Sequence, residues 1–226
     1  MRAANPSPMT LDGTNTYVAA GWVIDPGPDD PAHLQAVLDA AGEPQGVVLT
    51  HDHLDHAEGA ERLSSMAGGV PVMHPGAGDD AGPFEVVRSP GHSQDSVCLI
   101  HARICFSGDT VLGEGSVFVP SGGGGLAGYL AALEQLRQLE LEVICPGHGP
   151  IVWEPRERIT QYIEHRLERE QKVLDAIAAG ATTDDEILER AWDDAPIDRV
   201  PVLRVAASAT LQAHLEKLRE EGRLPT

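Results

Sequence analysis

Histidine and aspartate are concentrated in one short segment of this 226-residue chain. Residues 47–56 read VVLTHDHLDH, an apolar run followed by His51, His53, Asp55 and His56. Histidines two residues apart, followed by an Asp-His pair just beyond a strand, can point four side chains at one spot. Imidazole nitrogen and carboxylate oxygen are the ligands that Zn²⁺ prefers when cysteine is absent. The segment therefore predicts a metal site rather than a polar surface turn.

Three further motifs each place one more such side chain in a glycine-containing loop. They read PGH at 90–92, SGDT at 107–110 and PGHG at 146–149, and each comes after an apolar, strand-like run. Rigid α/β scaffolds tend to carry functional residues on loops at the ends of strands. Seven ligands are too many for one tetrahedral ion and suit two ions that share a bridging ligand. The candidate ligands are His51, His53, Asp55, His56, His92, Asp109 and His148.

Short strand-like runs alternate with helical patterns over the first two thirds of the chain, as expected of a layered α/β domain. The expected strands are residues 16–19, 22–25, 46–49, 70–73, 84–88, 97–100, 104–107 and 143–145. The expected helices between them are residues 31–41, 57–67 and 126–139. Residues 121–125 read SGGGG and are expected to form a flexible loop.

Beyond Trp153 the pattern becomes helical. A long amphipathic helix is expected over residues 154–180, a capping box opens a short helix after Thr183, and a third helix is expected over residues 205–219. Three helices and a short tail are typical of a winged-helix-like module with a stunted wing. We therefore expect two domains, a catalytic domain over residues 1–155 and a helical module over residues 156–226.

Charge and composition exclude several protein classes. The 35 acidic and 16 basic side chains give a formal net charge of −19, which counts against nucleic acid as a bulk electrostatic partner. No apolar run reaches the roughly 18 residues that span a bilayer, and the first residues lack the apolar core of a secretory signal. Cys98, Cys105 and Cys145 lie in apolar runs and are expected to be buried thiols. We expect a cytoplasmic protein with no membrane partner.

Taken in chain order, THDHLDH, PGHS, SGDT and PGHG resemble the successive metal motifs of the metallo-β-lactamase fold hydrolases. This resemblance implies an αββα sandwich and two metal ions bridged by Asp109. It assigns the first ion to His51, His53 and His92. It assigns the second ion to Asp55, His56 and His148. Asp25, in VIDPGP, matches an early aspartate of the family that supports the metal loop rather than binding metal.

Longer segments resemble the β-lactamase-like protein 2 branch of that superfamily, which ends in a winged-helix module. They are NPSPMTLDGTNTYV, GDTVLGEGSVFV, YIEHRLEREQKVL and LQAHLEKLREEGRL. The resemblance covers residues 5–224, nearly the whole chain.

Two divalent ions about 3.5–4 Å apart lower the pKa of a shared water towards about 7. The prediction is a dinuclear zinc-dependent hydrolase that uses a metal-bridging hydroxide, with Mn²⁺ or Fe²⁺ as alternative metals. Asp55, beside the hydroxide, is a candidate for holding its proton. The substrate is expected to be a small ester, a thioester or an acyl group borne on a carrier. Residues 112–125 are expected to form the pocket wall and a lid.

Two other functions are weighed against this one. A metal-dependent endoribonuclease acting on single-stranded RNA is favoured by the branch resemblance, and residues 199–223 hold five basic and three acidic side chains. A non-enzymatic winged-helix regulator is disfavoured by the complete ligand set.

The other histidines are given peripheral roles. His33 and His101 are expected to be solvated, and His214 is expected to pack in the C-terminal module. His74 is expected near the pocket, and His165 beside the site or between the two domains.

Overall fold

Two four-stranded sheets form the centre of the molecule. The computed structural model describes residues 1–122, 125–197 and 199–224, so the predicted 121–125 loop lies partly outside the described residues. The first sheet contains, in order, β1 (Tyr17–Ala19), β2 (Trp22–Ile24), β3 (Gly46–Val48) and β4 (Val72–Met73). The second contains β5 (Glu85–Arg88), β6 (Val97–His101), β7 (Ile104–Gly108) and β8 (Val143–Pro146).

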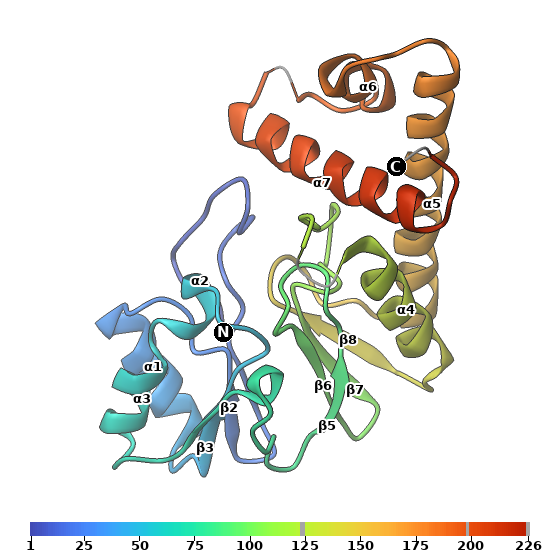
Figure 1. The fold of residues 1–226 in the computed structure, drawn as a ribbon. Coiled ribbons are helices and arrows are strands. Elements are labelled where there is room, and N and C mark those ends of the chain that lie inside the picture. The colour runs from blue at the N-terminus through green and yellow to red at the C-terminus, as the bar shows by residue number, and fades with distance from the viewer. Residues whose placement is uncertain (123–124, 198, 225–226) are drawn as a thin grey trace.

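Helices cover the outer face of each sheet. Figure 1 shows α1 (Pro31–Ala41) and α3 (Ala60–Met66) against the first sheet and α4 (Gly125–Gln138) against the second. A short helix, α2 (Leu54–Ala57), precedes α3, and one 3-10 turn, η1 (Pro75–Ala77), follows β4. The layers run helix, sheet, sheet, helix, which confirms the predicted αββα sandwich.

Apolar side chains fill each interface between the layers. Leu34 of α1 and Val47 of β3 are fully buried between the first sheet and the helices that cover it. Val48, Leu99 and Phe106 meet between the two sheets. Because successive strand residues point to opposite faces, Val47 and Val48 stabilise different layers of the sandwich.

All eight predicted strands form, with ends within two residues of the prediction. The helix predicted over residues 57–67 forms as α3 over residues 60–66, and its predicted start is wrong, because Ala57 belongs to the separate helix α2. The helical hydrogen-bond pattern is interrupted at Gly59, whose N–H donates to the Gly27 carbonyl at 2.9 Å. A β-carbon on Gly59 would lie 2.7 Å from Leu34 Cδ2, so this close approach favours glycine.

Three helices follow the sandwich. They are α5 (Pro155–Ala178), α6 (Asp184–Ala191) and α7 (Pro201–Glu220). The capping box at Thr183 is confirmed, and α7 begins four residues earlier than predicted because Pro201 occupies the first turn, where proline is favoured.

Helix α5 joins the sandwich to the helices that follow it. Near its start, Ile159 packs in the apolar cluster of the second sheet and α4. Near its end, Val173 packs in a separate cluster with α6 and α7. Figure 1 shows α6 and α7 above the sandwich, with α7 crossing over α4. The division into domains at residue 155 stays a prediction, and no strand follows β8 within residues 147–197 and 199–224.

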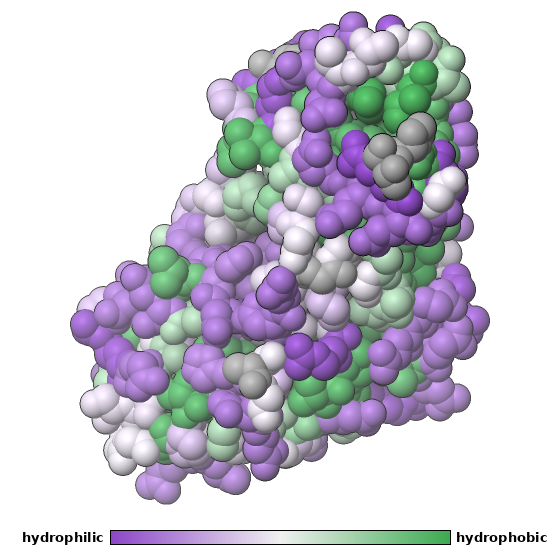
Figure 2. All heavy atoms as spheres, viewed as in Figure 1, coloured by the Kyte–Doolittle hydropathy of each residue, from purple (hydrophilic) through white to green (hydrophobic). Residues whose placement is uncertain are grey.

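The face of the molecule drawn in Figure 2 is largely polar, with hydrophilic residues over most of it. Cys98 and Cys105 are buried and Cys145 half-buried, and all three are free thiols. Across the described residues, no helix combines the length and hydropathy needed to cross a membrane.

Candidate metal centre

The candidate ligands are carried on loops that leave the carboxyl ends of four strands, β3, β5, β7 and β8. Strands β2 and β3 run parallel, as do β7 and β8. Strand β5 pairs antiparallel with β6 and β6 antiparallel with β7, so β5 runs in the direction of β7 and β8. The loops within each sheet therefore emerge at one edge, which brings distant sequence motifs together.

Asp25 anchors the loop that follows β3. Its carboxylate accepts hydrogen bonds from the Thr50 amide at 2.8 Å and the Thr50 hydroxyl at 2.7 Å. The same carboxylate lies 2.9 Å from His56 Nδ1. Asp25 is 2% exposed and has a left-handed backbone with φ of 48°. Because few residues other than glycine adopt that conformation without strain, three buried partners are expected to hold it in place.

The first group of ligand atoms comes from three histidines. His53 Nδ1 lies 3.1 Å from His51 Nε2 and 2.8 Å from His92 Nε2. A neutral imidazole has one N–H and one lone pair, so three rings converging this closely cannot all be satisfied by one another. A cation between them would accept all three lone pairs.

The second group comes from Asp55, His56 and His148. The Nε2 atoms of His56 and His148 lie 3.3 Å apart, and His148 Nε2 lies 3.2 Å from Asp55 Oδ2. Each group, taken alone, has its ligand atoms within 4.8 Å of one another.

Asp109 lies between the two groups. Its Oδ1 is 3.4 Å from His56 Nε2, and its Oδ2 is 3.4 Å from His148 Nε2 and 3.5 Å from His92 Nε2. Oδ1 is buried and has no hydrogen-bond partner. A buried carboxylate oxygen without a donor is costly, and a metal ion would compensate it. The structure therefore brings all seven predicted side chains together, and their chemistry fits metal binding.

In His92 and His148, the ring nitrogen that faces away from the cluster contacts a backbone carbonyl. His92 Nδ1 donates to the Phe118 carbonyl at 3.0 Å, and His148 Nδ1 lies 3.3 Å from the Gly13 carbonyl. Such outer hydrogen bonds fix the ring orientation and the tautomer of a metal-binding histidine. Both rings therefore present Nε2 to the centre.

Burial and neighbouring charge act in opposite directions on the pKa values of the cluster. Burial lowers the pKa of His51 well below 6.5 and lowers that of His92 as well. For His148, burial is outweighed by the nearby carboxylates, chiefly Asp109 and Asp55, and the pKa rises to about 9. Burial would raise the pKa of Asp109, but the adjacent His56 and His148 hold it well below 3.8.

These shifts predict how the stability of the metal-free protein depends on pH. The raised pKa of His148 contributes stability below pH 6.5 that is lost as pH rises through about 9. The lowered pKa of His51 acts oppositely, since stability is lost as pH falls below 6.5. In EDTA, Tm is expected to be highest near pH 6.5 and to fall on both sides. Saturating Zn²⁺ should abolish the alkaline fall, because metal replaces the proton on His148. A Tm in EDTA that rose between pH 6.5 and 9 would contradict this.

Gly147 gives a direct steric test of the centre. A β-carbon there would lie 2.5 Å from Asp109 Oδ1 and 2.6 Å from His56 Cε1. Gly147→Ala is therefore expected to displace both side chains and to lower kcat/KM about 100-fold. Gly128→Ala is the control, because its β-carbon would come no closer than 3.6 Å, from Pro90, and alanine favours the helix. Equal activity of the two variants would contradict the expectation.

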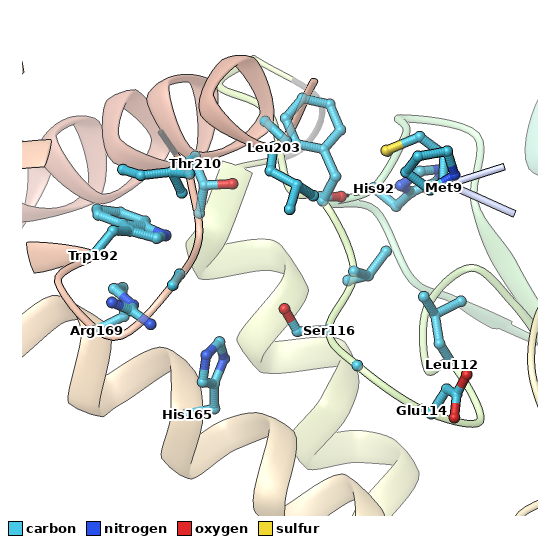
Figure 3. Close-up of a pocket in the computed structure, with 18 of the residues that line it drawn as sticks. Met9, His92, Leu112, Glu114, Ser116, His165, Arg169, Trp192, Leu203 and Thr210 are labelled. Atoms are coloured by element: carbon cyan, nitrogen blue, oxygen red, sulfur yellow. Dashed lines mark hydrogen bonds between the residues drawn. The ribbon is translucent and has the colours of Figure 1, made fainter. Parts of the chain in front are cut away.

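A cavity of about 440 Å³ opens beside His92 and Asp109. It lies between the sandwich and the C-terminal helices. Its walls include Leu112 and residues 114–118, which confirms the first half of the pocket wall predicted over residues 112–125, while the lid stays a prediction. Figure 3 shows Met9 beside His92 at one end of the cavity, and His165, Arg169 and Trp192 at the other.

Sequence reasoning missed several residues that line this cavity. It assigned no pocket role to Pro8, Met9 and Leu11, or to Arg166, Arg169 and Trp192. The available signal was the match of the N-terminal and YIEHRLEREQKVL segments to the family branch, since these segments supply most of the missed residues.

The remaining histidines are not among the candidate ligands. His74 lies outside the cluster, with Nδ1 2.8 Å from Asp52 Oδ1. His165 lines the cavity and His214 is fully buried, as expected. The expectation that His33 is solvated is wrong, because the ring is half-buried and its Nε2 lies 3.0 Å from the Thr16 hydroxyl.

The sequence of this chain matches one protein-family profile and several named relatives. The profile of the Metallo-beta-lactamase superfamily matches residues 9–89 and 76–148. The Beta-lactamase-like protein 2 homolog of Drosophila melanogaster is 30% identical, covering 97% of this chain and 87% of that protein. The atrochrysone carboxyl ACP thioesterase of Aspergillus fumigatus is 30% identical, covering 86% of this chain and 73% of that protein.

Solved structures show the same fold. A metallo-beta-lactamase family protein from Thermus thermophilus superposes with a TM-score of 0.74 at 21% identity, covering 96% of this chain and 92% of that one. A protein solved in a di-iron-bound form has a TM-score of 0.55 at 28% identity, covering 67% of this chain and 94% of that one. Ligand motifs, sandwich and sequence matches agree, and the chain belongs to the metallo-beta-lactamase superfamily.

Proposed function

We propose that this metallo-beta-lactamase-fold hydrolase is a dinuclear zinc enzyme that cleaves small esters or thioesters, including acyl groups carried on a protein. The observation that carries the proposal is the position of Asp109 between two groups of three ligands, at the mouth of a cavity of about 440 Å³. The first ion would be held by His51, His53 and His92. The second would be held by Asp55, His56 and His148.

The chain's own residues position and polarise the reacting groups. Two divalent cations in this site would activate a water molecule as hydroxide and stabilise negative charge on the carbonyl oxygen. The side chain of Asp55 is 30% exposed and that of Asp109 10%, so Asp55 is the carboxylate that reaches solvent. We assign to Asp55 the acceptance of the water's proton. Asp25 holds His56 in place from behind.

The walls of the cavity support an acyl substrate. Leu112, Val117 and Leu203 offer apolar surface along its length, which suits methylene groups better than a sugar-phosphate chain. The Aspergillus fumigatus relative is named a thioesterase for an acyl carrier protein substrate, which supports the same class of bond.

Single-stranded RNA is the alternative substrate, with residues 199–223 as the basic contact. Three basic side chains of that segment pair with carboxylates: Arg204 with Asp185 at 3.0 Å, and Lys217 and Arg223 with Glu170. These pairs reduce the cationic character of the segment and favour the acyl proposal. We also propose a winged-helix-like module over residues 156–226, supported by the shared apolar cluster of α5, α6 and α7.

One preparation assayed on two substrate classes tests the proposal. Acyl thioesters of increasing chain length are expected to be hydrolysed, with activity lost in EDTA, restored by Zn²⁺ and absent in His53→Ala. His101→Ala is the matched control, because that ring lies at the turn between β6 and β7, outside the cluster. Cleavage of single-stranded RNA that shows the same dependence on metal and His53, without thioester hydrolysis, would overturn the acyl assignment.

A further inference from the structure

Buried polar atoms without a hydrogen-bond partner occur at two places in the described part of the chain. One is Asp109 Oδ1 in the metal centre. The second place is formed by Arg166 Nε on α5 and both ring nitrogens of His214 on α7. Native proteins rarely leave such atoms unpaired, so each case calls for a partner that binds there.

Arg166 is a buried cation without a counter-charge. Its side chain is 2% exposed, its guanidinium donates to the Val117 carbonyl, and it lies over the Tyr129 ring at 5.6 Å from the centroid. No carboxylate within residues 1–122, 125–197 and 199–224 lies at ion-pair distance from it. By contrast Arg169, one turn further along α5, pairs with Asp194 at 2.8 Å.

His214, which interacts electrostatically with Arg166, supplies no negative charge to it. His214 is fully buried, and its pKa is lowered to about 3 by burial and then by the nearby Arg166 and Lys217. The ring is therefore neutral and neither repels nor neutralises the guanidinium. A buried charge without a counter-ion is unfavourable, so the opposite charge is expected to come from a bound molecule.

Arg166 lines the cavity that opens beside His92 and Asp109. A molecule in this cavity can therefore place one end at the metal centre and another against Arg166. Leu112, Val117 and Leu203 line the same cavity and would contact an apolar middle section. The cavity thus combines a reaction site, an apolar wall and a buried cation.

We propose that Arg166 binds a carboxylate on the substrate, at the end of the acyl group away from the bond that is cleaved. The substrate class is then a monothioester or monoester of a dicarboxylic acid. This inference rests on the proposed hydrolase function and adds the chemistry of the acyl group. Guanidinium is suited to carboxylate because its N–H groups form short, charge-assisted hydrogen bonds.

Kinetics on two matched substrates test the assignment. Adipoyl and hexanoyl thioesters of the same small thiol have equal chain length and differ in a terminal carboxylate. Wild-type protein is expected to prefer the adipoyl thioester by about 10- to 100-fold in kcat/KM, mainly through KM. Arg166→Gln should lose that preference, so that the ratio of the two kcat/KM values, measured on one preparation, falls to about one.

Arg158→Gln is the matched control. Arg158 also lies on α5 and also donates to loop carbonyls, those of Leu112 at 3.2 Å and Gly115 at 2.9 Å, but it does not line the cavity. This variant should keep the adipoyl preference. Arg166→Lys is a second variant that keeps the positive charge if Arg166→Gln fails to fold, and it should retain only part of the preference because lysine lacks the planar donors.

Calorimetric binding to the zinc-loaded protein separates this inference from the proposed hydrolase function. Adipate and hexanoate each offer one carboxylate to the metals, so tighter binding of adipate reports on the second carboxylate. We expect about tenfold tighter binding of adipate by wild type and Arg158→Gln, and equal binding by Arg166→Gln. An adipate preference without thioester hydrolysis would support the anion site and reject the hydrolase. Equal binding by wild type, a preference retained by Arg166→Gln, or Arg166-dependent binding of a short single-stranded RNA without adipate binding would overturn the inference.

Discussion

Asp109→Asn will lower kcat/KM at least about 100-fold, because even the outer partners of metal ligands contribute 10- to 100-fold. The substitution replaces one oxygen of the carboxylate between the two ligand groups with an amide nitrogen that cannot bind a cation. It also removes the negative charge that raises the pKa of His148. Zinc content, measured by metal analysis, should fall from two ions per chain to one or fewer.

Asp52→Asn is the control for this substitution. Asp52 lies between His51 and His53 in the sequence, yet its side chain is 58% exposed and turned to His74. The same change from carboxylate to amide should therefore leave kcat/KM within about threefold and zinc content unchanged. Two zinc ions and a full rate in Asp109→Asn would reject the bridging assignment.

Asp25→Ala will destabilise the protein and weaken metal binding together. It removes the acceptor of the Thr50 amide and hydroxyl and the partner of His56 Nδ1, all of them buried. Each buried donor left unpaired costs about 1–3 kcal/mol, so the free energy of unfolding should fall by about 3 kcal/mol or more. In EDTA this corresponds to a Tm lower by roughly 6–12 °C. Zinc affinity, from chelator competition, should fall by about 10- to 100-fold.

Asp25→Asn separates the effect on stability from the effect on zinc affinity. The amide oxygen can still accept from the Thr50 amide, so the loss of stability should be smaller than in Asp25→Ala. The carboxylate that orients His56 is absent in both variants, so zinc affinity should fall in both. A variant Asp25→Ala with unchanged Tm in EDTA would show that Asp25 does not anchor the loop.

The sequence predicted the ligands well because they belong to short motifs placed directly after strands. A buried run such as residues 46–49 fixes a strand, and the polar residues beyond it must then lie at the edge of a sheet. The αββα sandwich followed from the alternating runs together with the resemblance to the family. The boundary errors arose where a distant contact decides, as at Gly59, whose N–H donates to the Gly27 carbonyl instead of continuing α2.

What the sequence by itself determined is the kind of chemistry, since residue type and local spacing fix which side chains emerge from each loop. Only the tertiary structure decided which partners those side chains meet. Spacing along α5 could not show that Arg166 is buried without a carboxylate while Arg169 pairs with Asp194, because each environment is made by segments far away in the chain. The cavity likewise exists only because the C-terminal helices pack over the sandwich, and that packing brings Arg166 and the metal centre into one pocket.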